Sequence, residues 1–389
     1  MHSRDLIEQY KTYVQDWRRY FHKHPELSNE EFETTKTLAK ELESMGVEVH
    51  VDTERKTGLI GIIHGAKPGK AIALRADIDA LPVQEHNTFD FKSDVDGKMH
   101  ACGHDCHMSM LLGAARILLG MTDEIHGEVR LLFQPAEECS VGSRMMIKAG
   151  ALDGVDTIFG THIWSEVDAG TISCAPGQRM ANTDWFRIDI KGVSAHGSMP
   201  HKGVDAVVVA AEIVVALQVL VSRDISPFEP LVVTVGEIHG GEARNIMAGS
   251  AYLTGTIRTW SDKTRKAMPE RLEHLIQRSA KAFNAKAKLT YQEGNAGLSN
   301  DSECSERCRK SVVKLFGEEA VSDYEGTLAG EDFSEYLDIV PGVFVFLGCR
   351  NPDVDAVYPQ HSGYYTVDES VLKNGAALAA QYAIDFLAE

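Results

Sequence analysis

Short apolar runs alternate with helical segments through the first 163 residues, and this alternation restricts the fold more than any other feature of the sequence. The segment Ser28-Asn29-Glu30-Glu31 has the pattern of a capping box that starts a helix. Strands and helices that alternate in this way predict an α/β sheet with helices on both faces. Helices are expected at Asp5–His22, from the capping box to about Gly46, and at Asp105–Leu119, and strands at Leu59–His64, Ala71–Ala76, Glu128–Phe133 and Thr157–Ile163.

Acidic residues and a histidine follow three of these strands. Asp77 and Asp79 come after the second strand, the pair Glu137-Glu138 follows the third, and His162 ends the fourth. Open α/β sheets keep their sites at the carboxyl ends of the strands. Random placement would scatter such groups over both ends of the sheet, so their agreement indicates one site.

The segment His100-Ala101-Cys102-Gly103-His104-Asp105 places a thiol and imidazoles around a glycine. Borderline-soft transition metals prefer sulfur and imidazole nitrogen, and Gly103 lets the backbone turn so that Cys102 and His104 converge. Structural zinc sites usually use tight clusters such as C-x-x-C pairs, and this sequence has none. The pattern therefore predicts the metal site of an enzyme. Further ligands are expected among Glu137-Glu138, His162 and His361.

A different pattern begins at about Trp185, where the order β-α-β-β-α-β is typical of a ferredoxin-like domain. The length of 389 residues exceeds what one hydrophobic core usually supports. We therefore expect a larger catalytic α/β domain in two parts, residues 1–184 and 297–389, with a lid domain inserted at 185–296. The lid elements are expected at Trp185–Lys191, Val204–Val221, Leu231–Ile238, Ala251–Arg258, Ser261–Ala285 and Ala287–Gln292, and the catalytic domain closes with a strand at Phe344–Leu347 and a helix at Glu369–Leu387.

Composition and charge argue against several classes of protein. The formal charge of −18 would repel a phosphate backbone, so no nucleic acid partner is expected. Seven cysteines without framework spacing argue against a disulfide scaffold. No uninterrupted apolar run approaches the roughly 20 residues that span a bilayer, and the N-terminus lacks the apolar segment of a signal peptide. We expect a cytoplasmic protein with no membrane partner.

Five ordered motifs lie at Leu74–Pro82, His100–His107, Phe133–Glu138, Gly255–Thr259 and Glu331–Ser334. They closely resemble those of the N-acyl-amino-acid amidohydrolases, which include hippurate hydrolase, the auxin-conjugate hydrolases and N-acetyldiaminopimelate deacetylase and are related to the carboxypeptidase-G and aminoacylase metallopeptidases. The resemblance covers nearly the whole chain, including His22–Leu27. It implies an α/β domain that holds two divalent metal ions and a lid domain that often mediates dimerisation, so a homodimer or higher homo-oligomer is expected.

The resemblance also implies a set of metal ligands. Cys102 matches the ligand that bridges the two metals. The other ligands it implies are His104, Glu138, His162 and His361. The final histidine of the family is usually followed by a proline two residues on, whereas this chain has Gly363 there. The pocket wall beside that ligand is therefore expected to differ.

Residues around the metals are implied in the same way. Asp77 and Asp79 resemble the acidic pair behind the metals, one of which orients a ligand. His196 resembles a lid histidine that binds the substrate carbonyl, in some relatives from the neighbouring subunit. Asn245 and Arg258 match residues that contact the substrate carboxylate.

Hydrolysis of an amide needs a stronger electrophile and a stronger nucleophile than the carbonyl and free water offer. Two metals about 3.5–4 Å apart meet both needs, and a thiolate ligand suits zinc, manganese or cobalt better than magnesium. Glu137 matches the general base that takes the proton from the attacking water and passes it to the leaving amine. Arg258 can hold a carboxylate with two hydrogen bonds, which favours N-acyl amino acids such as N-acetyl or N-benzoyl compounds as substrates.

Other interpretations compete with these assignments. A dipeptidase or carboxypeptidase of the same architecture is the closest alternative function, and a non-catalytic metal-binding protein is a more distant one. Glu137 argues against the latter, which would have little need of a base beside a full ligand set. Each residue also has a structural interpretation. Glu137-Glu138 would then be a solvated start of a helix, and His162 would be a hydrogen-bonded core histidine. Arg258 would form an ion pair with a carboxylate of the lid. Cys106 and His107 are interpreted as packing residues at a helix start.

Overall fold

A seven-stranded mixed sheet forms the centre of the larger part of the chain. The computed structural model describes residues 3–52 and 54–389. The four inner strands are parallel. Most of their residues are buried, except at the beginnings of β3 and β4, which explains their apolar runs. In order across the sheet the strands are β1 (Glu48–Val51), β2 (Leu59–His64), β4 (His126–Gln134), β3 (Lys67–Asp77), β5 (Thr157–Asp168), β15 (Gly342–Arg350) and β6 (Ile172–Ser173).

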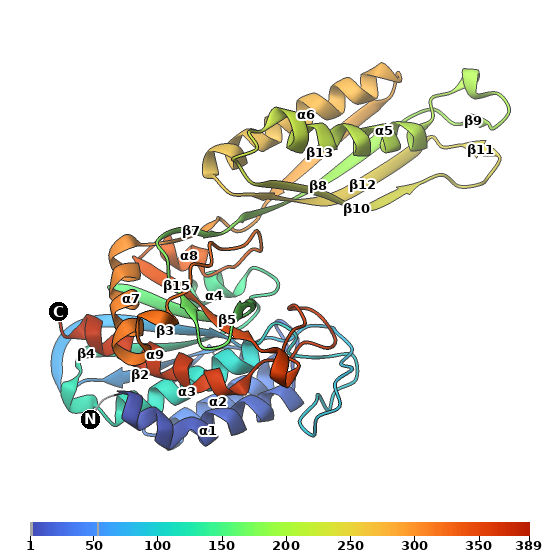
Figure 1. The fold of residues 1–389 in the computed structure, drawn as a ribbon. Helices are drawn as coiled ribbons and strands as arrows, with labels where there is room; N and C mark the ends of the chain where they lie inside the picture. The colour runs from blue at the N-terminus through green and yellow to red at the C-terminus, as the bar shows by residue number, and fades with distance from the viewer. Residues whose placement is uncertain (1–2, 53) are drawn as a thin grey trace. The chain divides into compact units, whose positions relative to one another are not determined.

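Helices cover this sheet, as Figure 1 shows. α3 is buried along nearly its whole length between α1, α9 and the central strand β3. α2 packs on β1 and β2, α4 on β4, and α7 on β15 and α9. The helices of this unit are α1 (Ser3–Lys23), α2 (Phe32–Ser44), α3 (His104–Leu119), α4 (Gly142–Lys148), α7 (Ser302–Phe316), α8 (Ser334–Leu337) and α9 (Leu372–Leu387). The α/β class predicted from the alternation of strands and helices is confirmed.

The predicted capping box at Ser28 to Glu31 is wrong. Helix α2 begins at Phe32, and no side chain caps it from the N-cap position at Glu31. The side chain of Glu26 caps it instead, because its carboxylate accepts from the N–H groups of Glu33 and Thr34. Ser28 and Glu31 both bind residues from distant segments of the chain.

Contacts divide the chain into two compact units. The first comprises Met1–Gly177, Ser299–Glu325 and Asp332–Glu389, and the second comprises Gln178–Leu298 and Gly326–Glu331. The second unit has its own hydrophobic core, and its four-stranded antiparallel sheet has the order β10-β12-β8-β13. Its main elements are β8 (Asn182–Lys191), α5 (Ala206–Val219), β10 (Leu231–Gly240), β12 (Ser250–Thr259), α6 (Asp262–Ala282) and β13 (Lys286–Glu293).

Two short pairs of strands complete the fold. β9 (Ala195–His196) pairs with β11 (Ile246–Met247), and β7 (Gly177–Met180) pairs with β14 (Leu298–Asn300). Helix α5 packs on β10, β12 and α6, yet it leaves a row of valines exposed, of which Val215 is the most exposed at 66%.

One helical stretch among the described residues, Ala206–Asp224, is long and apolar enough to cross a membrane. Length and composition do not separate such a span from a helix that packs on a sheet, and α5 packs on one. The absence of a membrane partner stays a prediction.

Candidate active site

The carboxyl ends of two adjacent parallel strands bring the acidic candidates together. Asp77 is the last residue of β3 and pairs in register with Gln134, the last residue of β4. Asp79 and the Glu137-Glu138 pair follow these ends. His162 was expected at the end of its strand but lies inside β5, two residues beyond Gly160, the last residue that pairs with β3.

Gly103 shapes the turn before α3. Its φ of +97° lies in the left-handed region, where glycine is favoured. A Cβ atom at this position would lie 2.5 Å from the Ile163 side chain and 2.9 Å from the Tyr365 hydroxyl. The backbone therefore turns tightly between Cys102 and His104.

The five predicted metal donors form one connected cluster. The Cys102 sulfur lies 3.5 Å from Nε2 of His162. Oε1 of Glu138 lies 3.9 Å from Nε2 of His104 and 3.6 Å from Nε2 of His361. Cys102, Glu138 and His361 offer ligand atoms that all lie within 4.8 Å of one another, as do Cys102, His104 and His162. Residues separated by up to 259 positions in the sequence thus meet at one place.

Hydrogen bonds fix the direction of two of the three imidazoles. Nδ1 of His104 is 3.2 Å from Asp79, and Nδ1 of His162 is 2.6 Å from the carbonyl oxygen of Ile163. Both rings therefore turn Nε2 toward the cluster. His361 is held through its backbone, because its N–H donates to the carbonyl of Ala101 at 2.7 Å.

The cluster fits a cation. Among the residues that the structure describes, Nε2 of His104 and Oε1 of Glu138 are buried without a hydrogen-bond partner. Burial lowers the pKa of His104, but the nearby carboxylates of Asp77, Asp79 and Glu138 prevail and raise it to about 10. Thiol, imidazole and carboxylate donors in an electronegative site suit divalent transition metals.

The sequence patterns did not predict a network of buried hydrogen bonds behind Asp77. The guanidinium of Arg75 donates to Asp77, to Gln134 and to Asp332, and all four side chains are buried. The amide of Gln134 donates to both oxygens of Asp332 at 2.8 and 3.0 Å, and the N–H of Ser143 donates at 2.9 Å. The signal that the sequence offers is that Arg75, Asp77, Gln134 and Asp332 lie in motifs named above.

His107 was interpreted as a packing residue, and the structure gives it a polar role. Its Nδ1 lies 2.5 Å from Asp77, and its Nε2 accepts the N–H of Ile163 at 2.9 Å. Both ring nitrogens are therefore engaged. His107 connects Asp77 to the strand segment that carries His162.

The candidates of the second unit lie in two places. His196 and Asn245 are neighbours, because the N–H of Gly197 donates to the carbonyl of Asn245 at 2.9 Å. Both belong to a ribbon that continues from the end of β8 and β12, where Lys191 pairs with Ser250; Figure 1 shows β9 and β11 beyond the ends of these strands. Arg258 lies eight residues along β12 from Ser250, about 26 Å at the usual rise of a strand.

The local surroundings of these side chains also differ. Nδ1 of the exposed His196 accepts from the N–H of Ser198 at 3.1 Å and lies 2.8 Å from the Ser198 hydroxyl, so the proton of the neutral ring is on Nε2. Burial lowers the pKa of Arg258, and Asp184 acts in the opposite direction. Within one chain, Arg258 is too far from His196 and Asn245 for one small substrate to touch both places.

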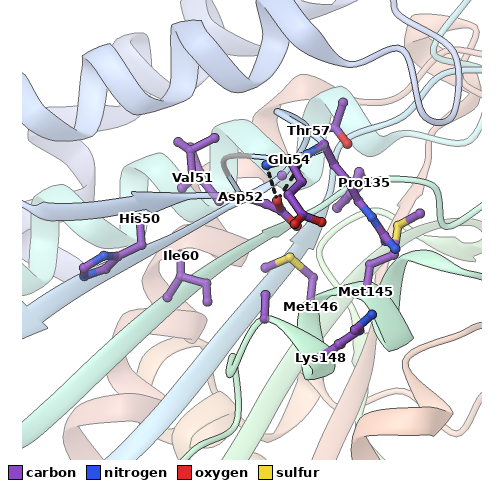
Figure 2. Close-up of a pocket in the computed structure, with 14 residues that line it drawn as sticks. His50, Val51, Asp52, Glu54, Thr57, Ile60, Pro135, Met145, Met146 and Lys148 are labelled. Atoms are coloured by element: carbon purple, nitrogen blue, oxygen red, sulfur yellow. Dashed lines mark hydrogen bonds between the residues drawn. The ribbon is translucent and has the colours of Figure 1, made fainter.

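A separate cavity of about 410 Å³ lies beside Pro135 (Figure 2). Residues of β1, β2 and α4 line it, and none of the candidate metal donors is among the described residues around it. Gly58, on its wall, packs so tightly on Pro135 that a Cβ would lie 2.5 Å from the ring. The cavity therefore lies beside this turn and is separate from the metal cluster.

Comparisons with known proteins agree with this geometry. The model of peptidase family M20/M25/M40 matches residues 73–385. The chain is 39% identical over 98% of its length to thermostable carboxypeptidase 1 of Saccharolobus solfataricus, covering 99% of that protein. It is 42% identical over 74% of its length to the N-acyl-L-amino acid amidohydrolase of Geobacillus stearothermophilus, covering 78% of that protein.

A solved structure gives the same result. The Bacillus subtilis YXEP protein, described as a dinuclear metal binding peptidase, superposes with a TM-score of 0.86 at 34% identity and covers 98% of this chain and 99% of its own. The donor groups of this chain could hold metal ions of the kind that the description of this neighbour names, and the chain belongs to peptidase family M20/M25/M40 as a metal-dependent amidohydrolase.

Proposed function

We propose that the protein removes the acyl group from N-acyl amino acids. The observation that carries the proposal is the convergence of Cys102, His104, Glu138, His162 and His361 beside Glu137 at the carboxyl edge of the sheet. A relative that is 42% identical is named as an amidohydrolase of this substrate class.

Glu137 is the proposed general base. It is nearly buried, and one of its oxygens lies 4.0 Å from Nε2 of His104. The metals, when bound, lower the pKa of water and stabilise charge that develops on the substrate oxygen. Glu137 would take a proton from the attacking water and pass it to the leaving nitrogen, and the buried surroundings exclude competing water.

We assign the metals as zinc, manganese or cobalt. Sulfur and imidazole donors outnumber carboxylates in the cluster, which disfavours magnesium and calcium. Asp79 acts as a support, because it orients His104 and accepts the N–H of Glu138 at 3.0 Å. Asp77 supports the site through His107.

We propose a homodimer in which His196 and Asn245 of one chain and Arg258 of the other chain contact the same substrate. The separation of these residues along β12 supports this arrangement, since one lid cannot bring both ends to one substrate. The exposed valines of α5 offer an apolar face for a second copy of the chain.

A mixing experiment tests this assignment. His196→Ala and Glu137→Gln chains are each expected to be inactive, and a mixed dimer should regain activity because one of its two sites has an intact His196 and an intact Glu137. No regained activity in a mixed dimer, verified by its mass, would contradict the exchange.

A carboxypeptidase is the second candidate, favoured by the relatives of that name that match 98% of the chain. The two functions differ in whether the substrate may carry a free α-amine. Metal-depleted protein should be titrated with zinc, manganese or cobalt and assayed on N-acetyl amino acids, N-benzoyl amino acids and unblocked dipeptides. Cleavage of dipeptides alone would replace the first proposal by the second, and no cleavage of any of them at full metal content would refute both.

A further inference from the structure

The turn that carries Glu137 and Glu138 has a strained backbone. Two of its residues other than glycine, Ala136 and Ser140, have positive φ values of +52° and +57°. Such conformations are unfavourable by about 1–3 kcal/mol each and persist only where the surroundings hold them. The position of the general base therefore depends on groups outside the turn.

Several of these groups are visible. The N–H of Glu138 donates to Asp79, and the N–H of Ser143, just after the turn, donates to Asp332. The N–H of Ala136 donates to Oε1 of Glu31 at 2.8 Å. Glu31 thus binds the residue that directly precedes the general base, at one of the two strained positions.

Glu31 is an unusual residue for this task. Its side chain is fully buried, and its second oxygen, Oε2, has no hydrogen-bond partner among the residues that the structure describes. Burial raises the pKa of Glu31 to about 7, backbone N–H groups including that of Ala136 oppose the shift, and Asp79 adds to it. A buried carboxylate with an unpartnered oxygen is unfavourable for stability. Stability alone gives little reason for an acid at this place.

We propose that Glu31 is a positioning residue that holds the backbone at Ala136 so that the carboxylate of Glu137 points at the reacting water. The proposal rests on the proposed function in one respect, the role of Glu137 as the base. It gives a purpose to the segment from Ser28 to Glu31, which does not cap α2. Ser28 has a parallel role, because its hydroxyl donates to Asp79 at 2.6 Å.

Two replacements of similar size separate positioning from packing. Glu31→Gln keeps an oxygen that can accept from Ala136, whereas Glu31→Met fills the space without an acceptor. Glu33→Gln, on the exposed side of α2, is the matched control. The measurements are kcat and KM on whichever substrate the wild type cleaves, metal content by elemental analysis, and Tm.

We expect Glu31→Met to lower kcat roughly 10- to 100-fold, since a displacement of about 1 Å has effects of this size. KM should stay within about twofold, with two metals per chain, because the N–H of Glu138 keeps its own acceptor, Asp79. Glu31→Gln should restore kcat to within about threefold of the wild type, and Glu33→Gln should match the wild type.

Equal kcat values for the Met and Gln variants would overturn the proposal. Loss of metal in Glu31→Met, or failure of that variant to fold, would also overturn it, because either would show a role in the site or the fold as a whole. These outcomes are independent of the substrate: wild-type cleavage of the panel tests the proposed function, and the ratio between variants tests Glu31.

Discussion

Replacement of Asp332 tests the buried network behind the site. Its carboxylate accepts from the guanidinium of Arg75 at 3.0 Å, from the amide of Gln134 and from the N–H of Ser143. Asp332→Ala leaves these three donors without their acceptor. Removal of one partner of a buried ion pair destabilises a protein by about 3–5 kcal/mol, and a buried neutral donor left unpaired adds about 1–3 kcal/mol. Arg75 keeps its ion pair with Asp77. We therefore expect the free energy of unfolding to fall by an amount near the lower end of this sum, about 5 kcal/mol.

The free energy of unfolding should be measured from urea titrations followed by circular dichroism. Asp332→Asn retains one oxygen acceptor. Its free energy of unfolding should be about 2–3 kcal/mol lower than that of the wild type, because a hydrogen bond to a charged group is replaced by a neutral one. Asp123→Asn, an exposed carboxylate of the same unit, is the control and should stay within about 0.5 kcal/mol of the wild type. An Asp332→Ala protein within about 1 kcal/mol of the wild type would show that the network does not stabilise the fold.

Three further predictions concern the metals and the base. Glu137→Gln should keep two metals and the fold while turnover falls about 10²- to 10⁴-fold, the usual contribution of a general base; a near-normal kcat would contradict its role. Cys102→Ala should hold fewer than two metals per chain by elemental analysis, and an unchanged content would contradict the bridging assignment. Dialysis against a chelator should abolish turnover but leave the far-ultraviolet circular dichroism unchanged, because the strands are held by a buried apolar core; zinc, manganese or cobalt should restore activity, and an active metal-free protein would refute metal dependence.

Local patterns were enough to predict much of the fold. The run Leu59–His64 forms β2 with the predicted bounds, and α3 differs from its prediction by one residue. These elements are buried and regular, so their sequences carry a clear apolar signal. β1 was missed because it is a short edge strand with alternating exposed residues. The structure also gathers the five donors that the sequence named, while their individual roles stay predictions.

Contacts between distant segments could not be predicted from local patterns. The capping box was wrong because the same serine and glutamate find tertiary partners, Asp79 and Ala136, that compete with the helix end. Arg75 and Asp332 are 257 residues apart, and their pairing leaves no periodic trace in the sequence. The separation of His196 from Arg258 likewise depends on the length and register of β12, which the motifs do not encode.

The distances between donors along the chain have a consequence for maturation. Glu138 and His361 meet only when the 222 residues between them are folded. In an unfolded chain, these two side chains therefore do not bind the same metal ion. The fold is expected to form from its buried apolar core before the ions bind, unlike in zinc fingers, where the ion organises the polypeptide. Newly made protein should accumulate first as a structured, inactive precursor whose activation depends on the supply of ions in its surroundings.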